Sequence, residues 1–136
     1  MGLPVKISSS QGSGFLELRD SEWSGAEVAS FTATLTADGM EASTGVYVMG
    51  GDGVANLFEA MATEWRGWDG VKGWESLEGD LEVAAQHDRL GQITVRITLR
   101  HNLPPEWEAR AELTLDPGEQ LEVAARDLRR FFTPGE

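Results

Sequence analysis

The chain has 136 residues, of which 40% are hydrophobic and 25% are charged, and this size and composition are typical of one globular domain. Its 23 acidic residues outnumber 11 basic ones, and the net charge of −12 opposes binding to nucleic acid or anionic lipid. It contains no cysteine, no readable signal peptide and no apolar run near the roughly 20 residues that span a bilayer. We therefore expect a single cytoplasmic domain over residues 1–136, without a nucleic-acid or membrane partner.

The first part of the chain has the period-two alternation of β-strands. Val5–Ser9 and Phe15–Arg19 alternate on either side of a polar loop, which predicts an N-terminal hairpin over residues 5–19. The alternation resumes at Phe31, and Asp38-Gly39 then supplies a two-residue turn into a strand over residues 40–49. These segments favour an antiparallel sheet with one buried face.

A helix is predicted after Gly50–Gly53, because the apolar residues that follow recur at helical spacing: Val54, Leu57, Phe58, Met61, Ala62 and Trp65. Asp52 is placed to cap this helix and Gly67 to end it, so that residues 31–67 form sheet and first helix. The glycine loop lacks the Lys-Ser/Thr pair of a phosphate-binding loop, and Asp52 would repel an anion. Trp65 is expected to face the sheet.

Residues 75–115 predict a meander of three strands, at Leu77–Ala85, Ile93–Leu99 and Trp107–Leu115. Their alternation places Trp107 on the core side. In such a meander, Arg96 and Arg100 face acidic residues on both neighbouring strands, which favours structural ion pairs over ligand binding.

The last helix is predicted over residues 117–132. Asp116 is the expected N-cap, with Pro117 at the first helical position and Glu119 completing the capping signal. An apolar stripe follows: Leu121, Ala124, Ala125, Leu128, Phe131 and Phe132. The predicted fold is therefore α+β, an antiparallel sheet of about six to seven strands packed on one face by two α-helices.

The residues that could carry catalysis are few. His87 and His101 are the only histidines, and no serine stands in a nucleophile-elbow setting. His87-Asp88 resembles a base with its carboxylate, but neighbours on a strand point to opposite faces. Four acidic residues could supply paired carboxylates, yet most alternate on a solvent face: Glu75, Glu78, Asp80 and Glu82. We expect no enzyme activity, no cofactor and no metal site.

The sequence between Val46 and Phe132 resembles an actinobacterial family of unknown function, number 6228. The resemblance is carried by the following elements: Phe58, Trp65, Arg66-Gly67-Trp68-Asp69-Gly70, Trp74, Leu77–Leu81, Gly91–Leu99 and Gly118-Glu119-Gln120-Leu121. That family is similar in turn to WapI-type immunity proteins, which act with wall-associated-protein toxins. The resemblance thus implies a protein that binds a toxin, and it carries over no catalytic residue.

Glu64–Glu82 holds three of the five tryptophans and four glycines. We interpret this segment as a structural joint between helix and sheet. If it binds a partner or ligand, the candidate residues are Arg66, Trp68, Asp69, Lys72 and Trp74. Of these, Trp68, Asp69 and Lys72 lie in the connecting turn and are expected to be the most exposed.

Three hypotheses for function follow. The first is a non-catalytic protein-interaction module, of the immunity type, whose acidic surface covers a basic toxin domain. The second is a small-molecule-binding domain with a tryptophan-lined pocket. The third is a homodimer formed through an exposed sheet edge. A purely solubilising role also accounts for the high negative charge and is the more common one for an acidic surface.

Overall fold

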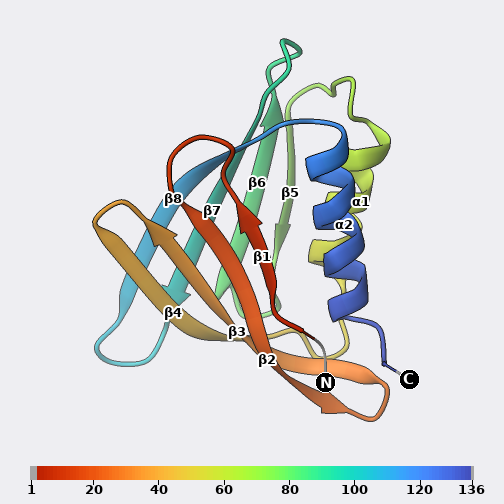
Figure 1. Cartoon of the computed structure of the whole chain (residues 1–136). Coiled ribbons are helices and arrows are strands. Elements are labelled where there is room, and N and C mark those ends of the chain that lie inside the picture. Colours follow the sequence, from red (N-terminus) through yellow and green to blue (C-terminus); the bar gives the residue numbers. More distant parts are fainter. Residues whose placement is uncertain (1–2, 136) are drawn as a thin grey trace.

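The computed structural model describes residues 3–135, which form eight strands and two helices (Figure 1). In chain order these are β1 (Val5–Ser8), β2 (Phe15–Ser24), β3 (Glu27–Ala37), β4 (Met40–Tyr47), α1 (Gly53–Thr63), β5 (Val71–Glu75), β6 (Leu81–His87), β7 (Ile93–His101), β8 (Trp107–Leu115) and α2 (Glu119–Phe131). The predicted α+β class, with antiparallel strands and two helices, is confirmed. Over the described residues, neither helix has the length and apolar character needed to cross a membrane.

The strands divide into two four-stranded antiparallel sheets, β1-β2-β3-β4 and β5-β6-β7-β8, rather than one sheet of six or seven strands. The helix α1 carries the chain from the first sheet to the second, and the strand pattern contains no information on which sheet each strand joins. The strand β5 was also not expected, because Gly73 and flanking polar residues interrupt its alternation. β2 extends past Arg19 to Ser24 through a bulge.

The two sheets approach each other on one side and diverge on the other (Figure 1). On the closed side β3 contacts β7 and β8, and β4 contacts β7. Hydrogen bonds join the sheets there: the Ser10 backbone N–H donates to the Thr114 carbonyl at 2.7 Å, and Thr44 Oγ1 lies 3.2 Å from His101 Nδ1. On the open side α1 packs beside β5, α2 beside β1, and the two helices pack on each other.

One hydrophobic core fills the space between the sheets and the helix pair. The inward-facing residues of both sheets alternate as their sequences predict, and Trp107 is half-buried against this core, also as predicted. Three phenylalanines from β3 and the end of α2 meet edge to face: Phe31, Phe131 and Phe132, with ring centroids 5.2 to 5.8 Å apart. These contacts attach α2 to the first sheet.

The two helices begin differently from the sequence expectation. Asp52 occupies the N-cap of α1 but makes no side-chain capping bond, and its carboxylate instead accepts from Asn56 and Arg129. The N-cap of α2 is Gly118 rather than Asp116, because Gly118 adopts a φ of 107° and so delays the helix to Glu119. The Asp116 backbone N–H bonds the Gln120 side chain at 2.8 Å.

Arg129 on α2 links the two helices through a network of hydrogen bonds. Its guanidinium donates to both carboxylate oxygens of Glu59 at 2.9 and 2.8 Å, and also to Asp52 and Asn56 on α1. The hydrogen bond from Arg129 lowers the pKa of Glu59 below its ordinary value of 4.5, and the same pairing raises the pKa of Arg129. The network therefore fixes α1 against α2 on the surface side of the helix pair.

Replacing this arginine tests the network. We expect Arg129→Ala to lower the free energy of unfolding by about 1 kcal/mol, since a bidentate pair exceeds a simple surface pair but the side chain remains 34% exposed to water. Urea unfolding measures the loss. Arg130→Ala is the matched control, because Arg130 is 69% exposed and its contact with Asp127 is long, at 3.8 Å. An equal loss of stability in both variants would contradict the account.

The same network predicts a pH dependence. Because Glu59 has a lowered pKa in the folded state, its stabilisation is present above pH 4.5 and is lost as the pH falls through the folded value. The difference in unfolding free energy between the wild type and Arg129→Ala should therefore shrink in acid. A constant difference across the acidic range would exclude this pair as its source.

Candidate functional site

The five residues predicted as a binding site lie between the end of α1 and β5, but the structure separates them into two groups. Arg66 and Asp69 are exposed, Lys72 and Trp74 are half-buried, and Trp68 is only 5% exposed. Trp65, which was expected to face the sheet, is instead 47% exposed. The exposures expected for the two tryptophans are therefore both wrong.

Trp68 is buried because the connecting segment folds back over β6. Gly67 and Gly70 adopt φ values of 140° and 71°, which side chains disfavour, and these glycines reverse the chain on either side of Trp68. The indole N–H donates to the Ala85 carbonyl at 3.4 Å, and the ring lies edge-on to His87 at 5.2 Å. Helical periodicity could not place this side chain, since it lies outside any helix.

Lys72 and Trp74 join α1 to β5. The Lys72 ammonium pairs with Glu64, just past the helix end, at 2.6 Å and lies 5.5 Å from the Trp68 ring. The Trp74 indole packs so closely on Gly53 that it would collide with a Cβ atom at that position. The contacts of both side chains, like those of Trp68, are made within the molecule.

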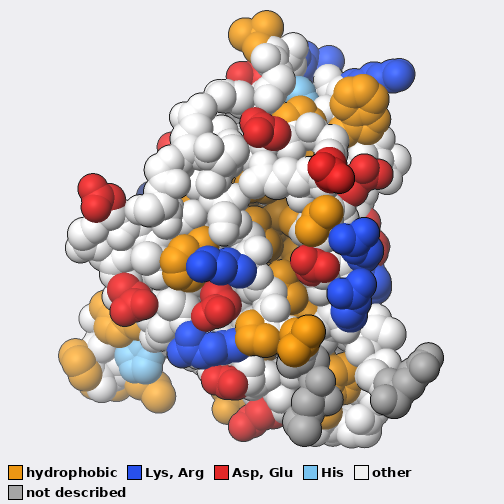
Figure 2. Space-filling view, viewed as in Figure 1, with side chains coloured by type: hydrophobic (Ala, Val, Ile, Leu, Met, Phe, Trp, Pro, Cys, Tyr) orange, Lys and Arg blue, Asp and Glu red, His pale blue; other side chains and the backbone are white. Residues whose placement is uncertain are grey.

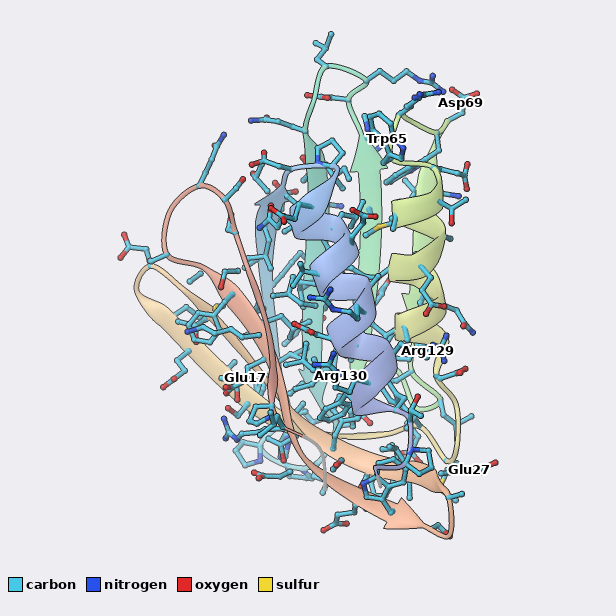
Figure 3. The ribbon with its side chains drawn as sticks, turned by 45° about the vertical axis from the view of Figure 1, so that its right-hand side comes forward. Glu17, Glu27, Trp65, Asp69, Arg129 and Arg130 are labelled. Atoms are coloured by element: carbon cyan, nitrogen blue, oxygen red, sulfur yellow. The ribbon has the colours of Figure 1, made fainter. Side chains whose placement is uncertain are left out.

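Trp65 is exposed because α1 ends at Thr63, one turn short of the predicted end. Its ring lies 4.9 Å from the Arg66 guanidinium, a cation–π contact. Leu90, at the tip of the β6–β7 turn, is 88% exposed, and its neighbour Arg89 bonds Asp69 at 2.8 Å. We name these five residues, Trp65, Arg66, Asp69, Arg89 and Leu90, the Trp65 corner. In Figure 3, Trp65 and Asp69 lie at one end of the helix pair, while Arg129 and Arg130 lie toward the other.

Hydrogen bonds hold the backbone of the Trp65 corner in place. The Nε2 atom of His87 lies 2.8 Å from the Trp65 carbonyl, and its Nδ1 accepts from the Arg89 N–H at 2.7 Å. One carboxylate oxygen of Asp88 accepts from the Leu90 and Gln92 N–H groups at 2.6 and 3.0 Å. The bonds from Gln92 and then Leu90 lower the pKa of Asp88. His87 and Asp88 thus order the turn that presents Leu90.

A hollow of about 260 Å³ lies beside this corner, lined by Ala62, Trp65, Gly118 and Glu122. It combines an aromatic wall with one carboxylate at its rim. Two further acidic residues, Asp116 and Glu119, flank Gly118 in the sequence and are exposed. The other two tryptophans of the segment do not line the hollow, so a pocket walled by several tryptophans does not form there.

Several other titratable residues make structural contacts. His101 stacks on Trp107 with ring centroids 5.5 Å apart. Arg100 contacts Glu82 at 2.8 Å and Glu108 at 3.7 Å, so the predicted pairing with acidic residues on both neighbouring strands is confirmed for this arginine. Arg96 contacts Glu112 on β8 at 2.9 Å, but its partner on β6 is Ala84, so only one of its two expected acidic neighbours is present. Among residues 3–135, no three His, Asp or Glu side chains are grouped to hold a metal ion.

Comparison with known proteins identifies the family. Residues 7–135 match the model of DUF6228, a family of unknown function. The chain belongs to this family. No curated protein and no solved structure matches the chain significantly. DUF6228 membership confirms the family resemblance of the sequence, whereas the further likeness to WapI-type immunity proteins and the actinobacterial origin stay predictions.

Sequence reasoning missed Arg89 and Leu90. One signal was present, because Asp88-Arg89-Leu90-Gly91 places a leucine in a segment with the composition of a turn. An apolar side chain at this turn tip is not buried by its own hairpin, so Leu90 is left available for a contact outside it.

The two tryptophans give a stability test of this site. We expect Trp68→Ala to lower the free energy of unfolding by about 3–5 kcal/mol, because it empties a packed position. Trp65→Ala should change it by about 0.5 kcal/mol or less, since it removes an exposed ring and retains the backbone carbonyl that contacts His87. Urea unfolding of both variants distinguishes them, and a larger loss for Trp65→Ala would contradict the assignment.

Proposed function

We propose that this DUF6228 protein is a non-catalytic protein-binding module that docks its partner on the Trp65 corner, and that it acts as an immunity-type protein against a basic toxin domain. The observation that carries the proposal is the pair of exposed apolar side chains, Trp65 and Leu90, on a corner whose backbone is fixed by hydrogen bonds.

The composition of the corner supports a protein interface. Tryptophan and arginine are the residues most enriched among those that dominate binding energy at interfaces. Trp65 and Arg66 are adjacent and already stacked, and Leu90 extends from the neighbouring turn. Because His87 and Asp88 fix the backbone that carries these side chains, binding would order few additional groups and would cost less entropy.

The charge distribution supports a basic partner. Eight of the chain's 11 lysines and arginines pair with acidic residues within the described part of the molecule: Arg19, Lys72, Arg89, Arg96, Arg100, Arg110, Arg129 and Arg130. On the face drawn in Figure 2, many of the basic side chains lie next to acidic ones. Because the Trp65 corner itself carries Arg66 and Arg89 against Asp69, the acidic surplus that attracts a basic surface and accelerates encounter with it lies on the rest of the molecule, including Glu122 beside the corner.

A co-expression experiment tests this function. If a neighbouring gene encodes a toxin domain, that domain is induced in cells that carry the wild type, the double variant Trp65→Ala with Leu90→Ala, or Leu77→Ala. We expect the wild type to restore growth and the double variant to lose at least about 30-fold in affinity for the purified toxin domain, as removal of central interface residues does.

Leu77→Ala is the matched control, because Leu77 is also highly exposed but lies in the β5–β6 turn. It should bind as the wild type does, and urea unfolding should show that all variants are folded. Failure of the wild type to bind the toxin domain would reject the immunity role. Full binding by the folded double variant would reject the Trp65 corner as the docking site.

A further inference from the structure

The four edge strands of the two sheets differ in how they are protected. An exposed edge can pair with a strand from another chain, and proteins usually cover or charge it. β1 lies beside α2 and β5 beside α1, while β8 alternates Glu108, Arg110 and Glu112. In β4, the stretch from Ala42 to Tyr47 has no charged residue, and no helix contacts it closely. β4 lies on the side of the molecule remote from the helices (Figure 1).

The register shows which backbone groups of β4 point outward. A two-residue turn at Asp38-Gly39 makes Ala37 and Met40 a hydrogen-bonded pair, and such pairs then alternate along the hairpin. The Val48 N–H donates to the Ala29 carbonyl at 2.9 Å, in agreement with this phase. The N–H groups directed away from β3 therefore belong to alternate residues, Glu41, Ser43, Gly45 and Tyr47. Within residues 3–135, no turn, loop or side-chain hydrogen bond uses the N–H group of Ser43, Gly45 or Tyr47, in agreement with their outward direction in this register.

A hollow of about 240 Å³ opens on the outer face of the sheet next to this edge. Gly45 and Tyr47 of β4 line it together with Ser30 and Thr32 of β3 and Asp20 and Glu22 of β2. Asp20 adopts a φ of 55° within the β2 bulge, which brings it to the rim of the hollow. A Cβ atom at Gly45 would meet no atom within 4 Å, so the hollow is open at the edge strand.

The chemistry of this hollow suits a positively charged side chain. Asp20 and Glu22 each accept one hydrogen bond from a neighbour, from Arg19 at 3.3 Å and from Ser30 at 3.2 Å, which leaves further acceptor capacity. Tyr47, 52% exposed, adds an aromatic surface. Carboxylates beside an aromatic ring bind arginine or lysine through charge-assisted hydrogen bonds and cation–π contact.

We propose that β4 binds an extended, basic segment of the partner protein as an added strand, with an arginine or lysine side chain of that segment in the hollow beside Tyr47. Backbone hydrogen bonds to Ser43, Gly45 and Tyr47 supply affinity, and the hollow selects the side chain. The partner's basic character rests on the proposed function, while the docking geometry rests on β4 alone. A second copy of this chain is disfavoured as the occupant, since its net charge is −12.

The test uses the full chain and a phage-displayed library of random twelve-residue peptides. We expect enriched peptides to be β-branched and to carry a fixed arginine or lysine. In the complex with a synthesised enriched peptide, amide hydrogen exchange followed by NMR should slow at least about tenfold at Ser43, Gly45 and Tyr47. Enrichment of peptides without a basic residue, protection confined to another surface, or no enrichment would each overturn the proposal.

Two variants separate the parts of the site. Ser43→Pro removes an outward N–H and leaves the β3 ladder intact, because proline is tolerated on an edge strand with its nitrogen toward solvent. The double variant Asp20→Asn with Glu22→Gln removes the charges. Both should weaken peptide binding at least about tenfold, and Ser43→Ala should not. Unchanged affinity in the folded Ser43→Pro variant would overturn strand addition.

The Trp65→Ala, Leu90→Ala double variant should keep full peptide binding. Toxin binding through the Trp65 corner can therefore fail while β4 binds peptide, or succeed while β4 does not. Light scattering of the free protein adds one further outcome, since a dimer abolished by Ser43→Pro would identify a second copy as the occupant and overturn the proposal.

Discussion

The structure depends on the closure of a wedge. Two four-stranded sheets meet along one side, and on the other side only the pair α1 and α2 keeps water from their inner faces. The phenylalanines of β3 and α2 and the buried face of α1 supply the apolar contacts, and Arg129 fixes the surface side of the helix pair. Each helix alone could not close the opening, so the two must be placed together. The bidentate hydrogen bonds of Arg129 to Glu59 fix this relative placement.

The same closure determines where the candidate site lies. α1 must end near Thr63 so that the chain can cross to the second sheet, and the glycines after it fold Trp68 back onto β6. Trp65 lies between the end of α1 and the buried Trp68, and its side chain is therefore exposed. The β6–β7 turn is tied to it through His87, which brings Leu90 close to the same corner. The Trp65 corner is thus a product of the joint between helix and sheet.

The sequence predicted the parts governed by local pattern. Strand alternation placed Trp107 and Arg100 correctly, and the apolar stripes located both helices. What failed depended on long-range placement: the division of the strands between two sheets, the strand β5 with its internal glycine, and the exposures of Trp65 and Trp68. Positive φ values at Gly67 and Gly118 also shifted chain direction in ways that residue spacing does not encode. The candidate site lies in these non-periodic segments, which is why only Arg66 and Asp69 of the predicted residues are exposed there.

The central claim is that the Trp65 corner is where a protein partner binds, and hydrogen–deuterium exchange of a complex with a toxin domain that binds this protein tests it most directly. The account predicts that binding slows exchange in residues 62–70 and 87–92, while the β5–β6 turn around Leu77 exchanges as in the free protein. Unchanged exchange in both segments, in a complex that demonstrably forms, would contradict it.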